Sequence, residues 1–372
     1  DYTVSFTFPF VTPTAIEMLS QIFIMPEHIY KDVTDFEHND YNMNSVGTGP
    51  YKLVDYQSGS YLKFEANENY YKGEPSIKNV VFQIIENADT AILALQNGEV
   101  DAYQMTPQQV KKLDLDASNL STYSYSEGRV GYLEINCNRV TDEKVRKALL
   151  YAMDRKAMDD AAFESSEYYS IPYTFLPTNS QFYTEDGVEK YEQDVDKAKS
   201  MLEDAGVSGL KLKLGYMSSD AVQSAQALLI QEQLKEVGVT VELAGGDGTA
   251  IANAMKDPDN EYDMYLGGYI MGIDPDTFSS LFENDGAYNY MHYSGYDTID
   301  QLFEEGRSEL DESARKETYA KLQAAVQDTG AFYPIISNNK ILVVNNRIQG
   351  VEDAGLVPVY TFEDTSSLKI AE

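Results

Sequence analysis

The clearest alternation of apolar and polar positions lies in the middle of the chain. Residues 210–216 place Leu, Leu, Leu and Tyr at every second position, which predicts a strand with one buried face. A helical repeat follows through 227–237 and ends at Gly238, and residues 239–243 alternate again. A strand, a helix of this length and a second strand form a βαβ unit, so we predict a parallel sheet here.

Other segments carry helix and strand patterns with recognisable ends. The helix over 141–153 has Thr141 as its predicted N-cap, and a second runs from Asp194 to Gly206. Asp89 is the predicted cap of a helix that stops at Asn97-Gly98. Further strands are predicted over 1–8, 61–67, 77–85, 121–136, 263–266, 333–336 and 341–344. The mixture predicts an α/β protein with helices flanking mixed sheets.

A Gly47-Thr48-Gly49-Pro50 corner precedes the strand-like run from Tyr51. A glycine pair close to a lysine is one component of phosphate-binding loops. Here no third glycine opens a helix, and Pro50 lacks the N–H that a phosphate needs. We therefore interpret the segment as a structural corner, in which the glycines adopt backbone angles that other residues avoid.

Length and charge narrow the class of protein. With 372 residues, two lobes are expected, and 43% hydrophobic residues suit a folded chain. The formal net charge of −33 argues against a nucleic-acid partner and against a basic membrane-binding patch. Cys137, the sole cysteine, forms no internal disulfide, which leaves the redox compartment open.

Catalytic and metal-binding motifs find little support. His28, His38 and His292 are scattered without metal-ligand spacing, and no Gly-x-Ser-x-Gly elbow occurs. The acids of Asp274-Pro275-Asp276 do not fit a calcium loop, and carboxylate pairs are expected by chance in so acidic a chain. We therefore expect a protein that is not an enzyme and has no cofactor and no metal. A secreted glycan hydrolase remains the alternative from another class.

Several segments together resemble the extracellular solute-binding proteins of ABC importers, family 5, the oligopeptide/dipeptide-binding class. In chain order they are residues 46–53, 67–73, 98–102, 134–136, 145–155, 198–206, 262–264, 274–278 and 315–334. The resemblance implies a class II type, two-lobed periplasmic-binding-protein-like fold with a ligand cleft between the lobes. Lobe I would comprise 1–126 and 338–372, and lobe II 127–337. Family members usually have a longer N-terminal portion of lobe I, so we expect this chain to lack part of that lobe.

The resemblance also suggests ligand-binding residues. Asn136 lies where the chain would cross into lobe II, and it could bind a ligand's backbone or hold the hinge by a hydrogen bond. Tyr269 replaces a Trp that commonly forms a wall of the family's pocket, with core packing as the alternative. Tyr288, Tyr290 and the neighbouring polar residues would suit a cleft rim, although they could equally be ordinary loop residues.

Two positions depart from the peptide-binding pattern. Gly272 stands where peptide-binding members often carry an aspartate that pairs with the ligand's ammonium group, and Leu266 stands where some carry an arginine. Asp274 could take over from the missing aspartate, or it could cap a turn. The ligand is then either a peptide that is held differently or another solute.

The resulting hypothesis is a monomeric solute-binding protein, on the extracellular face of a bacterial membrane through a lipid anchor or in the periplasm. It would capture a small peptide by closure of two lobes and deliver it to an ABC permease. A binding protein for an oligosaccharide or metal chelate is the first alternative. A receptor that uses the same fold without transport is another.

Overall fold

The computed structural model describes residues 3–115, 119–163, 165–272, 274–294, 297–358 and 360–371. The chain divides into two compact units. The first comprises Asp1–Met18 and Ser126–Asn339, and the second comprises Leu19–Tyr125 and Lys340–Glu372. In the described ranges, no helix is both long and apolar enough to span a lipid bilayer.

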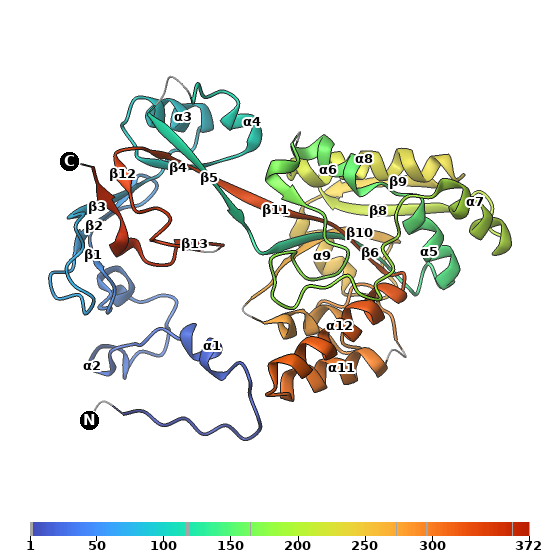
Figure 1. Ribbon diagram of the computed structural model, residues 1–372, viewed down its shortest axis with the longest axis horizontal. Coiled ribbons are helices and arrows are strands. Elements are labelled where there is room, and N and C mark those ends of the chain that lie inside the picture. Colours follow the sequence, from blue (N-terminus) through green and yellow to red (C-terminus); the bar gives the residue numbers. More distant parts are fainter. Residues whose placement is uncertain are drawn as a thin grey trace. The chain divides into compact units, whose positions relative to one another are not determined.

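The first unit contains a mixed sheet in which the strand order is β11–β6–β10–β8–β9 (Figure 1). Strand β6 pairs antiparallel with β10 and β11, whereas β8 pairs parallel with both β10 and β9. The strands of this unit are β6 (Arg129–Ile135), β7 (Tyr169–Ser170), β8 (Lys211–Met217), β9 (Thr240–Gly246), β10 (Met264–Ile270) and β11 (Phe332–Asn345), the last of which continues into the second unit.

Helices cover both faces of this sheet. They are α5 (Glu143–Tyr151), α6 (Arg155–Phe163), η2 (Ser166–Tyr168), α7 (Val195–Asp204), α8 (Ala221–Glu236), α9 (Gly248–Met255), η3 (Pro275–Phe278), α10 (Ser279–Phe282), α11 (Asp297–Ser308) and α12 (Glu312–Asp328). Alternation along β6 separates two cores, because Leu133 and Ile135 face α5–α8 while Val130 and Tyr132 face α10–α12. Two apolar faces explain why β6 is buried almost throughout.

The second unit is smaller and has several short sheets. Its elements are α2 (Glu27–Tyr30), η1 (Asp40–Asn44), β1 (Tyr51–Gln57), β2 (Tyr61–Ala66), β3 (Asn79–Gln83), α3 (Ala88–Gln96), β4 (Ala102–Met105), α4 (Pro107–Val110), β5 (Leu120–Ser126), β12 (Ile348–Gln349), β13 (Leu356–Val357), β14 (Thr361–Phe362), η4 (Thr365–Ser367) and β15 (Lys369–Ile370). Strands β1–β2–β3 form an antiparallel sheet, and β4 and β5 pair with β11. Helix α1 (Ala15–Ser20) includes the residues where the two units meet in the sequence.

Much of the predicted secondary structure is confirmed. The βαβ unit is β8–α8–β9, with its two strands parallel. The helix predicted from Asp194 is α7, and Asp194 caps it by accepting a hydrogen bond from the Lys197 amide. Two caps differ by one or two residues, because Asp142 caps α5 and Asn87 caps α3. In both cases an Asn or Asp close to the predicted cap accepts from the backbone N–H groups at the start of the helix, which have no partner within the helix.

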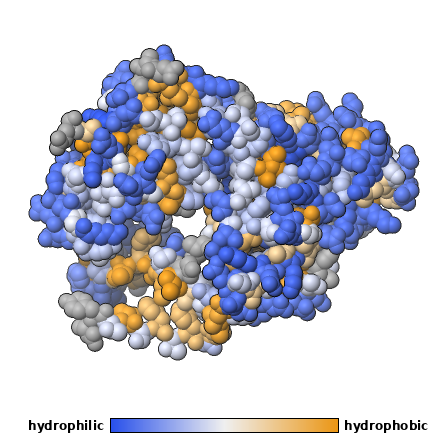
Figure 2. Space-filling model, viewed as in Figure 1, coloured by the Kyte–Doolittle hydropathy of each residue, from blue (hydrophilic) through white to orange (hydrophobic). Residues whose placement is uncertain are grey.

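Two predictions were wrong. Residues 3–8 form no strand, since no described segment pairs with them and a strand requires a hydrogen-bonded neighbour. Their apolar side chains are exposed, with Val4 at 74% and Phe6 at 59%, and Figure 2 shows apolar surface along this N-terminal segment. Gly47 and Gly49 do not have left-handed backbone angles. The Pro50 corner is held instead by Asn67, whose side chain donates to the Gly49 carbonyl.

Candidate functional site

A row of tyrosine rings runs along one face of the first unit. Tyr265 and Tyr269 project from the same face of β10, and Tyr288 and Tyr290 come from the loop after α10. The ring centroids of Tyr269 and Tyr288 lie 6.4 Å apart, those of Tyr288 and Tyr290 6.2 Å, and those of Tyr290 and Tyr265 5.9 Å. We call these four residues the tyrosine row. Tilted and edge-on rings at these separations attract one another beyond their buried area.

The loop that carries half of the tyrosine row has a fixed shape. The Tyr288 amide donates to the Ser280 carbonyl at 2.9 Å, and the Asn289 side chain donates to the Glu283 carbonyl at 3.1 Å. A Cβ on Gly286 would lie 2.5 Å from the Ser280 oxygen, so this turn requires glycine. The rings are therefore held in place before any ligand arrives.

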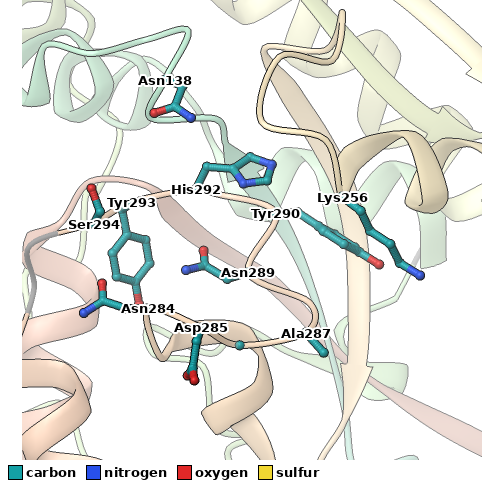
Figure 3. A pocket seen from close by; sticks show the side chains of 11 residues that line it. Asn138, Lys256, Asn284, Asp285, Ala287, Asn289, Tyr290, His292, Tyr293 and Ser294 are labelled. Carbon is teal, nitrogen blue, oxygen red and sulfur yellow. The ribbon is translucent and has the colours of Figure 1, made fainter.

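A polar cavity of about 360 Å³ opens beside Tyr290 (Figure 3). Its lining comprises Asn138, Lys256, Asn284, Asp285, Gly286, Ala287, Asn289, Tyr290, His292, Tyr293 and Ser294. His292 has a left-handed backbone with φ of 49°, and its Nε2 is 2.7 Å from the Met255 carbonyl. The Asn289 side-chain oxygen is buried and has no hydrogen-bond partner among the described residues. Amide, imidazole and charged groups of both signs favour a polar ligand here.

Asn136 is fully buried at the end of β6. Its backbone amide donates to the Asp263 carbonyl at 2.9 Å, and its side-chain oxygen accepts from the Asn138 amide at 3.0 Å. Its Nδ2 has no hydrogen-bond partner in the described part of the chain. The Asn136 side chain thus positions the turn that carries Asn138 at the cavity. Its buried N–H donor without a partner lowers the stability of the folded protein.

Asp274 has the capping role that the sequence left open. One oxygen accepts from the Asp276 amide at the start of η3, and the other accepts from Arg315 at 2.7 Å. The Tyr319 hydroxyl adds a contact at 3.3 Å. With 7% exposure and these partners, the carboxylate is committed to the protein itself. We therefore leave it out of the proposed ligand contacts.

Glu134 is a buried acid that the sequence did not single out. It lies on β6 opposite Tyr265, and neither carboxylate oxygen has a hydrogen-bond partner among the described residues. Burial raises the pKa of Glu134 well above its usual value, and burial followed by the Glu134 charge raises the pKa of Tyr265 to about 12. Glu134 lies in the Glu134-Ile135-Asn136 motif, and its neighbours in the sequence did not indicate that its carboxylate would be buried without a hydrogen-bond partner.

The described residues bring together no group of three His, Cys, Asp or Glu side chains that could hold a metal ion. His28 and His38 lie in the second unit, whereas His292 lines the cavity of the first. Burial raises the pKa of Cys137 to about 11, which keeps its thiol protonated at neutral pH.

The fold of the chain matches a class of solved structures. The ABC transporter substrate-binding protein CtaP of Listeria monocytogenes superimposes with a TM-score of 0.92 at 37% identity, over 98% of this chain and 75% of that protein. Structures of this class are two-lobed periplasmic binding proteins, and the predicted mixed α/β, two-lobed fold is confirmed.

Residues 1–290 match the model of the bacterial extracellular solute-binding proteins, family 5. The chain belongs to this family. The oligopeptide-binding protein AppA of Bacillus subtilis is 27% identical over 353 residues, and the match covers 87% of this chain and 63% of AppA. The nickel-binding periplasmic protein of Escherichia coli is 24% identical, with 87% and 65% covered. This chain thus spans less than two thirds of the length of these relatives.

Proposed function

We propose that this protein is the solute-binding component of an ABC importer and that it captures a peptide for delivery to a permease. Membership of family 5 carries the proposal, and the oligopeptide-binding relative supports a peptide as ligand. We assign the first unit to lobe II and the second unit to lobe I. In this proposal, ligand contacts from both lobes favour the closed state over the open one.

The tyrosine row is the proposed ligand surface of lobe II. Tyr288 is 44% exposed and Tyr269 is partly buried, so both rings present contact area. Their pre-set positions limit the rotamer entropy that is lost on binding. Tyr290 and the Asn136-supported turn border the adjoining polar cavity, which suits main-chain amides or a polar side chain of the ligand. Ordered water in such a cavity allows side chains of different size to be accepted.

The relatives support a binding protein rather than an enzyme, and the family's description is extracellular. We place this protein on the extracellular face of a bacterial membrane through a lipid anchor, or in the periplasm, and we propose that it acts as a monomer. A non-peptide solute such as a metal chelate or an oligosaccharide is the second candidate. The nickel-binding relative favours the chelate.

The experiment is a thermal-shift screen of the protein with short peptides, oligosaccharides and nickel chelates, followed by calorimetry on the hits. A ligand at a hundred times its Kd stabilises the folded state by about 2.7 kcal/mol, which gives a measurable rise in Tm. We expect peptides to raise Tm and the other classes to leave it unchanged. Binding of another class with no response to any peptide would refute the peptide assignment.

Two tyrosine variants test the proposed surface. Tyr288→Ala should weaken peptide binding by about tenfold, because a ring in contact with the ligand contributes about 1–2 kcal/mol. Tyr56→Ala is the matched control, since Tyr56 is 41% exposed on β1 and belongs to the second unit. Equal peptide affinity in both variants would remove the tyrosine row from the site.

A further inference from the structure

Arg129 differs from the other arginines of this acidic chain. Its side chain has no hydrogen bond or ion pair with any residue that the structure describes, although 61 acidic residues accompany only 28 Lys and Arg. Every other arginine donates to a carboxylate or a backbone carbonyl, namely Arg139, Arg146, Arg155, Arg307, Arg315 and Arg347. A partly buried guanidinium without a partner is therefore unusual here.

Glycines make room for the Arg129 side chain on the sheet. Arg129 is the first residue of β6 and lies opposite Ile270 of β10. A Cβ added to Gly268 would lie 2.0 Å from its Nη2 and 2.2 Å from its Cζ. A Cβ added to Gly131, the partner of Gly268 across the two strands, would lie 3.6 Å from its Nη1. The guanidinium thus rests on bare backbone at this pair, without a carboxylate to hold it.

The acids that follow β10 are already paired with other arginines. Arg315 holds Asp274, and Arg307 holds Asp276 and Glu283. Before the strand, the Glu127 carboxylate accepts from the Asn338 side chain. Arg129 is thus the cation at this end of the two strands whose side chain has no partner among the described residues.

Gly272 places no charged side chain at this strand end. The Met271 amide donates to the Gly128 carbonyl at 2.9 Å, which places residue 271 beside the start of β6. Gly272 follows, and its amide donates to the Thr277 hydroxyl at 3.3 Å. An acidic side chain at 272 could have paired with a ligand's ammonium group, but none is present. At position 272, therefore, no carboxylate competes with a ligand for the Arg129 guanidinium.

We infer that Arg129 binds a carboxylate of the ligand at this end of β6 and β10. The inference rests on the proposed function and adds a contact at the strand ends, on the face of β6 and β10 opposite to that of Tyr265 and Tyr269. A guanidinium presents a planar fork that matches the two oxygens of a carboxylate. The terminal carboxylate of a peptide and an acidic side chain share this chemistry.

The experiment compares wild type with Arg129→Gln by calorimetry, on one peptide with a free C-terminus and on its C-terminal amide. We expect the variant to bind the free acid about 10- to 100-fold more weakly and the amide with unchanged affinity. Arg129→Lys should fall between, because it keeps the charge and loses the fork. A pair of amidated peptides with Glu or Gln at one position distinguishes a side-chain carboxylate from the terminal one.

Gly268→Ala is a second variant that leaves Arg129 in place. Its Cβ would displace the guanidinium, so it should lower affinity for the acid as Arg129→Gln does. Arg347→Gln is the control for loss of one positive charge, since Arg347 pairs with Asp101 in the second unit. Melting curves of all variants show whether they are folded.

An equal ratio of acid to amide affinity in wild type and Arg129→Gln would overturn the inference. Failure of the proposed function has a different signature, in which wild type binds no peptide of either kind. In that case, wild type and Arg129→Gln are compared on a solute of the class found in the screen. One acidic compound and its neutral derivative then replace the peptide acid and its amide. Arg129→Gln must weaken the acidic compound selectively, or the inference fails there also.

Discussion

Asp159 is a buried acid whose replacement should stabilise the protein at neutral pH. It lies on α6 against α8, is fully buried, and neither of its oxygens has a hydrogen-bond partner among the described residues. Gln226 of α8 and Arg155 are its nearest favourable neighbours, but neither forms a bond to it. Arg155 donates instead to the Pro334 carbonyl at 2.7 Å and lies 3.8 Å from the centre of the Tyr333 ring. Little therefore compensates the burial of this carboxyl group.

Burial raises the pKa of Asp159 from 3.8 to about 9, against smaller favourable effects of Gln226 and Arg155. The folded protein then keeps a proton that the unfolded chain releases above about pH 4. The stability contribution is fully present below pH 3.8 and declines as pH rises toward 9. Each pH unit corresponds to about 1.4 kcal/mol, so about 4 kcal/mol is lost by pH 7.

Asp159→Asn removes this proton linkage and nearly preserves the shape of the side chain. The difference in unfolding free energy between variant and wild type should increase by about 1.4 kcal/mol per unit between about pH 5 and pH 8. Urea unfolding followed by far-UV circular dichroism measures it, and any constant offset from the amide cancels in the slope. A flat or falling difference would refute the assignment of Asp159 as a protonated buried acid.

Asp160→Asn is the matched control on the next residue. Hydrogen bonds from Lys156 and Tyr169 lower the pKa of the exposed Asp160, so its contribution is lost only as pH falls below its ordinary range. The control should therefore be slightly destabilised and show no slope over the same pH interval.

Two further variants follow from the other buried acids. Asp274→Ala leaves Arg315 buried without its 2.7 Å partner and should lower the urea-derived unfolding free energy by about 3–5 kcal/mol, with peptide affinity per folded molecule unchanged. A loss of affinity would return Asp274 to the ligand site. Glu134→Gln should become more stable relative to wild type as pH rises above about 4, because burial raises the pKa of Glu134 and the folded state retains its proton. Unfolding curves at about pH 5 and pH 8 measure this difference, and equal values at both would contradict it.

The sequence predicted elements whose patterns are local. The β8–α8–β9 unit has alternating strands, a helical repeat and a terminating glycine, Gly238, and these signals agree with the fold. Residues 3–8 alternate equally well and form no strand, because alternation describes faces and not the presence of a pairing partner. The caps of α3 and α5 were off by one or two residues because neighbouring Asx and Thr side chains compete for the same amides.

The sequence identified some residues of the candidate site and its surroundings and missed others. The difference between the two groups has a physical cause. Tyr269, Tyr288 and Tyr290 were identified as aromatic residues, and the structure brings their rings into one row. Asp159 follows Arg155 by four residues, a spacing that usually indicates a surface ion pair. Arg155 donates instead to backbone carbonyls of distant segments. Because these are tertiary contacts, the sequence did not show that Asp159 lacks an ion-pair partner.

The negative net charge of the protein is compatible with an anionic ligand. A charge of −33 repels anions over distances comparable to the Debye length, about 8 Å at physiological ionic strength. That repulsion acts on approach and is screened by salt. Arg129 acts at contact, where its partly buried fork is screened less and where the nearby acids are already paired. Net charge therefore argues against long polyanions such as nucleic acid, which must approach over a wide surface. It does not argue against a small ligand with one carboxylate, which in this inference binds the one guanidinium without a partner among the described residues.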